Sequence, residues 1–162
     1  MTAAPAAREP EMMNVRTFLA HAVQLEREAA RRYEELAASM GTDGNHELKA
    51  FFARMAHYSR LHLADATARG GFRDLPEMSP DEFEWPDGVS PEMAGWAGVD
   101  AMMSPLAALE LALQGERSGH AYYAAVAAST PDAELRAIAG EFAEEEADHV
   151  RQIEKLIRDC KV

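Results

Sequence analysis

The chain has 162 residues, and its 28 acidic and 16 basic side chains give a formal net charge of −12. This length suits a single domain, and the acidic balance argues against a nucleic-acid partner, because phosphate binding requires clustered Lys and Arg. The only cysteine, Cys160, excludes an internal disulfide and a paired-cysteine zinc or iron site.

Apolar residues recur with the period of an α-helix in four long segments. The helices are predicted over residues of about 11–40, 45–69, 104–128 and 131–159. The first is expected to stop at the glycines around residues 41–44, and the fourth to begin at Ser129-Thr130-Pro131-Asp132, where a hydroxyl cap, an early proline and an early aspartate agree. Residues 70–103 contain four prolines and both tryptophans. We expect a long crossover there, with Trp85 and Trp96 as its anchors or as part of a dimer interface.

The two halves of the chain repeat. Leu48-Lys-Ala-Phe…His62 aligns with Leu135-Arg-Ala-Ile…His149 without a gap. Glu26 precedes Tyr33 by seven residues, as Glu116 precedes Tyr123. The repeat predicts an all-α fold in which two related helical hairpins form one four-helix bundle over residues 1–162.

Several polar residues fall on the apolar faces near the middle of the predicted helices. They are Glu26, Ser59, His62, Glu116, His120, Glu146 and His149. Buried unpaired carboxylates are costly, so a cation is expected among them. The inward faces contain no Arg or Lys near this layer, which favours a bound metal ion. Glu146 and His149, three residues apart, point to one side of a helix.

Here the sequence resembles the ferritin-like superfamily, and rubrerythrin-type proteins most closely. The resemblance rests on Phe142-Ala-Glu-Glu-Glu-Ala-Asp-His149, on Leu113-Gln-Gly-Glu116…Tyr122-Tyr123 and on Leu25-Glu26…Tyr33. It implies a ferritin-like bundle in which Glu26 and Glu116 are terminal ligands and Glu146 bridges two metal ions. It also implies that His62 and His149 are terminal imidazole ligands, and that Tyr33 and Tyr123 place hydroxyls beside the ligand glutamates.

The sequence departs from this family at Ser59, where the second-helix motif Glu-x-x-His should begin. Three carboxylates leave an excess charge of +1 against two divalent ions, so at least one metal position should be weaker, or there should be room for hydroxide, water or another anion. His120, one turn after Glu116, is a candidate additional ligand, and Asp65 is a less central one. The site is thus expected to hold one or two iron ions, with manganese as an alternative.

The resemblance implies redox chemistry, either reduction of peroxide or oxidation of Fe(II) by oxygen or peroxide. The chain lacks the paired cysteines of a rubredoxin module, so an external reductant of unknown identity is required. Two other functions stay open, namely a degenerate bundle that serves as a structural or interaction module, and iron handling without turnover. We expect a cytoplasmic homodimer without a membrane or nucleic-acid partner, and surface positions for His21, His46 and His57.

Overall fold

The computed structural model describes residues 13–71, 75–86, 88–92 and 99–160. This part of the chain contains four long α-helices, one short 3-10 helix and no strand. The elements are α1 (Val15–Thr42), α2 (His46–Gly70), η1 (Pro80–Glu82), α3 (Pro105–Ser129) and α4 (Ala133–Cys160). The predicted all-α class is therefore confirmed. Among the helices described, none is long and apolar enough to cross a membrane.

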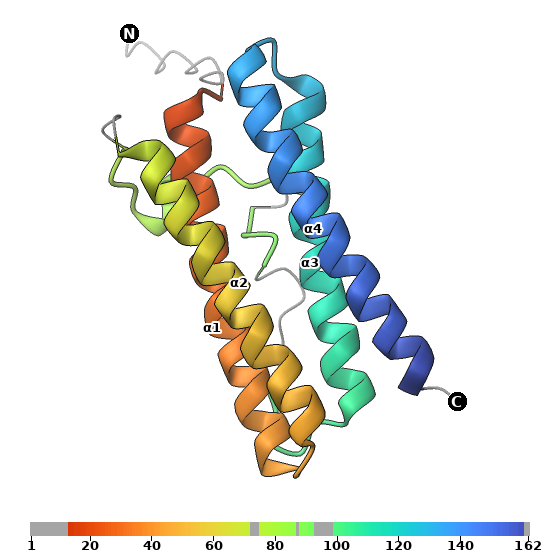
Figure 1. The fold of residues 1–162 in the computed structure, drawn as a ribbon. Coiled ribbons are helices and arrows are strands. Elements are labelled where there is room, and N and C mark those ends of the chain that lie inside the picture. Colours follow the sequence, from red (N-terminus) through yellow and green to blue (C-terminus); the bar gives the residue numbers. More distant parts are fainter. Residues whose placement is uncertain (1–12, 72–74, 87, 93–98, 161–162) are drawn as a thin grey trace, which may run out of the picture.

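The helices form two antiparallel hairpins that lie side by side (Figure 1). α1 packs along α2, and α3 packs along α4. The crossover returns from the end of α2 to the opposite end of the bundle, so α3 runs in the same direction as α2 (Figure 1). The prediction of a four-helix bundle made of two hairpins and a long crossover is confirmed.

The ends of α1 differ from the prediction because local side chains set them. The helix begins after Asn14, whose side chain accepts a hydrogen bond from the backbone N–H of Thr17 at 2.9 Å. It was expected near residue 11; residues 11 and 12 lie outside the described part of the chain. At the other end, α1 extends into the predicted glycine cluster. Gly44 has a φ of +75°, which only glycine adopts without a steric cost, and the next helix starts after it.

The start of α4 also corrects the prediction. The expected hydroxyl cap at Ser129 or Thr130 was wrong. Instead, the carboxylate of Asp132 accepts hydrogen bonds from the backbone N–H groups of Glu134 and Leu135, at 2.8 and 3.1 Å. A carboxylate satisfies two free N–H groups at a helix start and also complements the helix dipole. Ser129 belongs to the end of α3.

The crossover lies against the bundle through Trp85, as predicted. The Trp85 ring is 5.2 Å from the ring of Tyr122 and 4.7 Å from that of His21, between centroids. His21 is 1% exposed, so its predicted surface position was wrong. Its Nδ1 donates to the carbonyl oxygen of Thr17 at 2.8 Å, and the aromatic rings cover the rest of the imidazole. Trp96 lies outside the described residues.

The apolar core forms two clusters, one toward each end of the bundle. One cluster is built from residues 33–40, 48–56, 108–112 and 153–157. The other is built from residues 15–25, 66, 122–123 and 135–143. On every helix, the residues between these ranges include the polar positions singled out by the sequence. The bundle therefore encloses a polar layer with apolar packing on both sides.

We predict that side chains buried in the two clusters stabilise the fold. A matched pair of leucine substitutions, one buried and one exposed, can test this through the free energy of unfolding. Leu109 on α3 is completely buried, whereas Leu61 on α2 is 51% exposed. Leu109→Ala should lower the free energy of unfolding by about 2–5 kcal/mol, because it leaves a cavity. Leu61→Ala should change it by less than about 0.5 kcal/mol. Chemical denaturation of both variants measures the difference, and equal effects would contradict the assignment of this core.

Candidate metal centre

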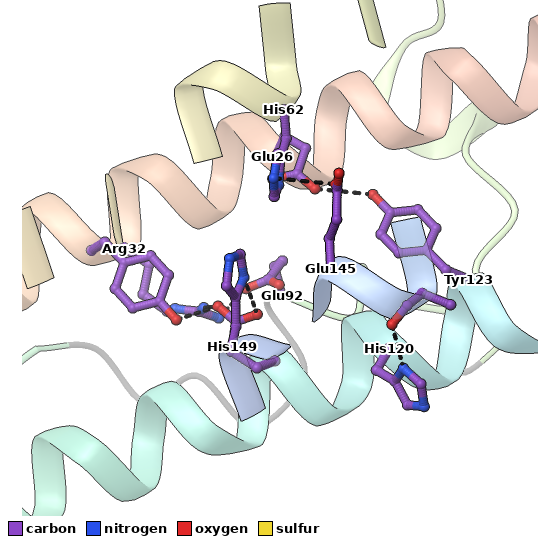
Figure 2. Close-up of polar contacts among 11 residues, drawn as sticks. Glu26, Arg32, His62, Glu92, His120, Tyr123, Glu145 and His149 are labelled. Atoms are coloured by element: carbon purple, nitrogen blue, oxygen red, sulfur yellow. Dashed lines mark hydrogen bonds and ion pairs between the residues drawn. The ribbon is translucent and has the colours of Figure 1, made fainter. Parts of the chain in front are cut away.

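The layer between the two apolar clusters contains acidic and imidazole side chains from all four helices (Figure 2). It combines Glu26 from α1, His62 from α2, Glu116 from α3, and Glu146 and His149 from α4. The three glutamates are at most 3% exposed and His149 is 8% exposed, while His62 is half-buried. Five of the six metal ligands predicted from the sequence thus meet in one layer.

The possible ligand atoms form two groups that share one residue. Glu26, His62 and Glu146 each offer one atom within 4.8 Å of the others, and so do Glu116, Glu146 and His149. Glu146 therefore faces both groups. Its spacing from His149 places the two side chains on one face of α4. Two neighbouring groups with a common carboxylate have the arrangement needed for a bridged pair of metal ions.

Each hairpin supplies a tyrosine hydroxyl to a glutamate of the other hairpin. The hydroxyl of Tyr33 on α1 donates to Glu116 Oε1 on α3. The hydroxyl of Tyr123 on α3 donates to Glu26 Oε1 on α1, at 3.3 Å. Both tyrosines are completely buried. These reciprocal bonds orient one oxygen of each glutamate and connect the hairpins across the layer.

The other oxygen of each glutamate faces an imidazole. His149 Nδ1 lies 3.3 Å from Glu116 Oε2, and His62 Nδ1 lies 3.7 Å from Glu26 Oε2. The two imidazole rings stack with their centroids 5.5 Å apart. In each pair the carboxylate and the imidazole come from the same hairpin, and the stacked rings bring the two pairs together across the layer.

The structure leaves His120 and Asp65 apart from this layer. His120 Nδ1 donates to the carbonyl oxygen of Ala143 at 2.8 Å, and His120 belongs to neither of the two groups (Figure 2). Its position one turn after Glu116 brings it against the backbone of α4 rather than to the other ligands. Asp65 is exposed and accepts a hydrogen bond from Arg69 Nε at 2.8 Å.

An arginine and a fourth glutamate, both missed by sequence reasoning, are buried beside the layer (Figure 2). Arg32 is 3% exposed, so the expectation that no Arg or Lys lies near the layer was wrong. Its Nη1 pairs with Glu92 Oε2, and its Nη2 lies 3.6 Å from Glu116 Oε1. Glu92 belongs to the crossover and is 2% exposed. Among the described residues, the layer therefore contains four carboxylates and one guanidinium.

Two glycines one turn apart on α3 make room for these side chains. A Cβ atom at Gly115 would overlap the guanidinium of Arg32. A Cβ atom at Gly119 would lie 3.2 Å from Glu146 Oε2 and 3.3 Å from Glu92 Oε1. Glycine inside a helix costs about 1 kcal/mol relative to alanine, so such a pair signals a close approach. The glycine pair in the sequence thus indicated that a bulky side chain, here Arg32, approaches α3 closely. No periodic pattern in the sequence indicates that Glu92 is buried.

The layer reaches solvent at the seam between α2 and α4. The side chain of His62 is 17% exposed, and its Nε2 lies 3.2 Å from Glu145 Oε2. The Glu145 side chain is 48% exposed. This pair therefore joins the buried groups to the surface, whereas the Glu116 side of the layer is enclosed.

Burial gives the acids of the layer unequal pKa values. It raises the pKa of Glu146 well above the ordinary range, and the charge of Glu116 adds to this effect. Burial also raises the pKa of Glu26, and that of Glu92 to about 8 although Arg32 opposes the shift. Burial acts in the same direction on Glu116, but hydrogen bonds from Glu146 and His149 lower its pKa to about 2. Without a metal ion, Glu26, Glu92 and Glu146 therefore hold protons more tightly than exposed glutamates do.

The fold and the layer together define an all-helical four-helix bundle with buried Glu and His groups that could bind metal. No protein-family model matches the sequence, and no curated protein matches it. Among solved structures, the chain is similar to the crystal structure of an uncharacterized conserved protein from Magnetospirillum magnetotacticum MS-1. The two sequences are 35% identical, the match covers 91% of this chain and 95% of that chain, and the TM-score is 0.76. The chain belongs to the same family as that conserved protein.

The raised pKa values predict that the metal-free protein loses stability as the pH rises. Above the ordinary glutamate value of 4.5, the unfolded chain releases protons that Glu26, Glu92 and Glu146 retain in the folded state. Unfolding then releases protons, so the free energy of unfolding falls until these acids ionise, near pH 8 for Glu92. Glu116 acts oppositely, because its contribution is lost below pH 4.5 as the pH falls toward 2.

Thermal unfolding of chelator-treated protein tests this prediction. The Tm should be lower at about pH 8 than at about pH 5, where the raised acids are still protonated in the folded state. Glu146→Gln keeps a neutral hydrogen-bonding group in place of the protonated acid, so the fall should be smaller in this variant. An equal fall in the wild type and in Glu146→Gln would assign the effect to other charges.

Proposed function

We propose that this chain is a ferritin-like, non-haem metal-binding protein that holds two iron ions and has rubrerythrin-like redox activity. The activity would be the reduction of peroxide, or the oxidation of Fe(II) by oxygen or peroxide. Manganese is the competing metal. The observation that carries the proposal is the position of Glu146, which belongs to two adjacent groups of ligand atoms.

The residues present fit such a centre. Carboxylate oxygens and imidazole nitrogens suit Fe and Mn, and hard oxygen ligands stabilise Fe(III). Four buried carboxylates face a single guanidinium, so the layer can accept the positive charge of divalent ions. The pKa values of Glu26 and Glu146 are raised, so their carboxyl groups hold protons tightly. A metal ion bound at the same oxygens would release these protons.

In this proposal, Glu26 and His62 hold one ion, Glu116 and His149 hold the other, and Glu146 bridges them. Tyr33 and Tyr123 keep the carboxylates of Glu116 and Glu26 in fixed orientations through their hydroxyl hydrogen bonds. A ligand whose orientation is fixed by an outer hydrogen bond loses less freedom when it binds metal.

Bound iron would supply the redox chemistry, since two Fe(II) ions hold the two electrons that convert one hydrogen peroxide and two protons into two water molecules. The protein groups control water and protons. The apolar clusters on both sides limit water to the seam between α2 and α4. There, Glu145 Oε2 can exchange a proton with His62 Nε2, which links the layer to solvent. The electrons must come from an external reductant, because the chain contains one cysteine and no cysteine pair.

The shared carboxylate distinguishes this proposal from the other functions that the sequence left open. A structural or interaction module would not need two overlapping ligand groups. An iron-handling protein without turnover would use the same ligands but would take up iron stoichiometrically and leave added peroxide unconsumed. Metal content and peroxide turnover therefore separate the three alternatives.

We predict that protein loaded anaerobically with Fe(II) retains two iron ions per chain by elemental analysis. Glu146→Gln should retain one or none, because it removes the carboxylate common to both groups. Glu144→Gln is the matched control, since Glu144 lies on the same helix but is exposed. It should retain the iron content of the wild type.

Loaded wild type and Glu144→Gln should then consume hydrogen peroxide in the presence of a chemical reductant, and Glu146→Gln should not. Equal iron content in the wild type and Glu146→Gln, or no iron in the wild type, would contradict the proposed centre. Two irons without peroxide or Fe(II) turnover would contradict the redox activity and favour iron handling.

A further inference from the structure

Among the described acids of the layer, Glu92 alone comes from the crossover rather than from a helix. It is 2% exposed, and its two oxygens have different surroundings. Oε2 pairs with Arg32 Nη1. Oε1 is fully buried and has no hydrogen-bond partner among the described residues. A buried carboxylate oxygen without a donor is costly, so it signals an interaction with a group outside the protein chain.

Glu92 belongs to neither of the two groups of ligand atoms, but its free oxygen lies beside Glu146, the residue common to both groups. Glu92 Oε1 and Glu146 Oε2 both lie in contact distance of the point where a Cβ at Gly119 would stand, at 3.3 and 3.2 Å. Gly119 therefore opens a space on α3 in which a crossover carboxylate approaches the carboxylate shared by both ligand groups. Two ionised carboxylates facing one space repel each other, so this space holds either a retained proton or a bound cation.

The ion pair with Arg32 does not account for this arrangement alone. A structural contact between α1 and the crossover would need only Oε2, and it would not require a glycine at position 119. The first hairpin also supplies one acid fewer to the layer than the second, because Ser59 stands at the position that aligns with Glu146. Ser59 is 4% exposed and carries no charge.

We propose that Glu92 is a metal ligand of this centre, and that its Oε1 supplies from the crossover the fourth carboxylate that α2 lacks at Ser59. The proposal rests on the metal-binding function argued above. Oε2 keeps its pair with Arg32, so Glu92 binds metal through one oxygen without a change in the crossover. The guanidinium of Arg32 then orients the carboxylate of Glu92 and does not compete with the metal ion for Oε1.

The test compares Glu92→Gln with Arg32→Gln in the full chain, using Co(II) as a spectroscopic probe and equilibrium dialysis to measure binding. Gln at position 92 preserves size and a hydrogen-bond acceptor for Arg32 but removes the charge. Glu92→Gln should lower Co(II) affinity by about tenfold or more and change the visible Co(II) absorption bands, which report the ligands. Arg32→Gln should also weaken Co(II) binding, because it removes the guanidinium that orients the carboxylate, but it should leave the bands close to those of the wild type, because the carboxylate remains.

The same change of the Co(II) bands in Glu92→Gln and Arg32→Gln would overturn the proposal and make the pair a structural contact only. Unchanged affinity and bands in Glu92→Gln would also overturn it, while the proposed metal centre would stand. No Co(II) or Fe(II) binding by the wild type would instead refute the metal-binding function itself.

A measurement on the wild type keeps the proposal testable if either variant fails to fold. Hydrogen exchange at the backbone amides of Gly88, Val89, Ser90 and Glu92 should slow when Co(II) is added, because the metal would connect the crossover to the bundle. Protection that appears at α1 and α4 but not at these residues would overturn the assignment of Glu92 as a ligand.

Discussion

The burial of four carboxylates beside one guanidinium is the constraint on which the rest of the structure depends. Glu26, Glu92, Glu116 and Glu146 are each at most 3% exposed, so water cannot stabilise their charges. In the isolated chain, the layer lowers its charge by retaining protons and by pairing with Arg32. Proton retention and pairing with Arg32 lower the charge of the layer, but they do not explain why two imidazoles also face these oxygens. The apolar clusters on either side keep the layer dry and make the demand for a cation stronger.

The two hairpins repeat in sequence, so they contribute equivalent side chains to the site. The site is asymmetric at the positions where the two copies of the repeat differ. Tyr33 and Tyr123 occupy equivalent positions and donate to glutamates of opposite hairpins. Each hydroxyl therefore needs the other hairpin to be in place, which couples hairpin packing to the geometry of the layer. The repeat is broken where Ser59 aligns with Glu146, and where Arg32 aligns with Tyr122. The proposed role of Glu92 connects these differences, since it would provide the missing acid and already pairs with the additional arginine.

Sequence reasoning succeeded where periodicity carries the information and failed where it does not. The four helices and the meeting of Glu26, Glu116 and Glu146 follow from positions on regular helical faces. Arg32 was missed because arginine is almost never buried, and only the glycine on the facing helix permits it. Glu92 could not be predicted, since a proline-rich crossover has no repeating pattern that places one residue inward. The capping of α4 was also mispredicted, because several residues near its start can accept the first hydrogen bonds.

The asymmetry implies that the two proposed metal positions are not equivalent. One group, with Glu26 and His62, meets the surface at Glu145 and has a half-buried imidazole. The other group, with Glu116 and His149, is enclosed by buried side chains. An ion in the first group would exchange with solvent more readily, and an ion in the second would be held in a drier site where charge interactions are stronger. The seam between α2 and α4 is then the side from which metal and a small oxidant can enter, and the enclosed side is where the crossover carboxylate acts.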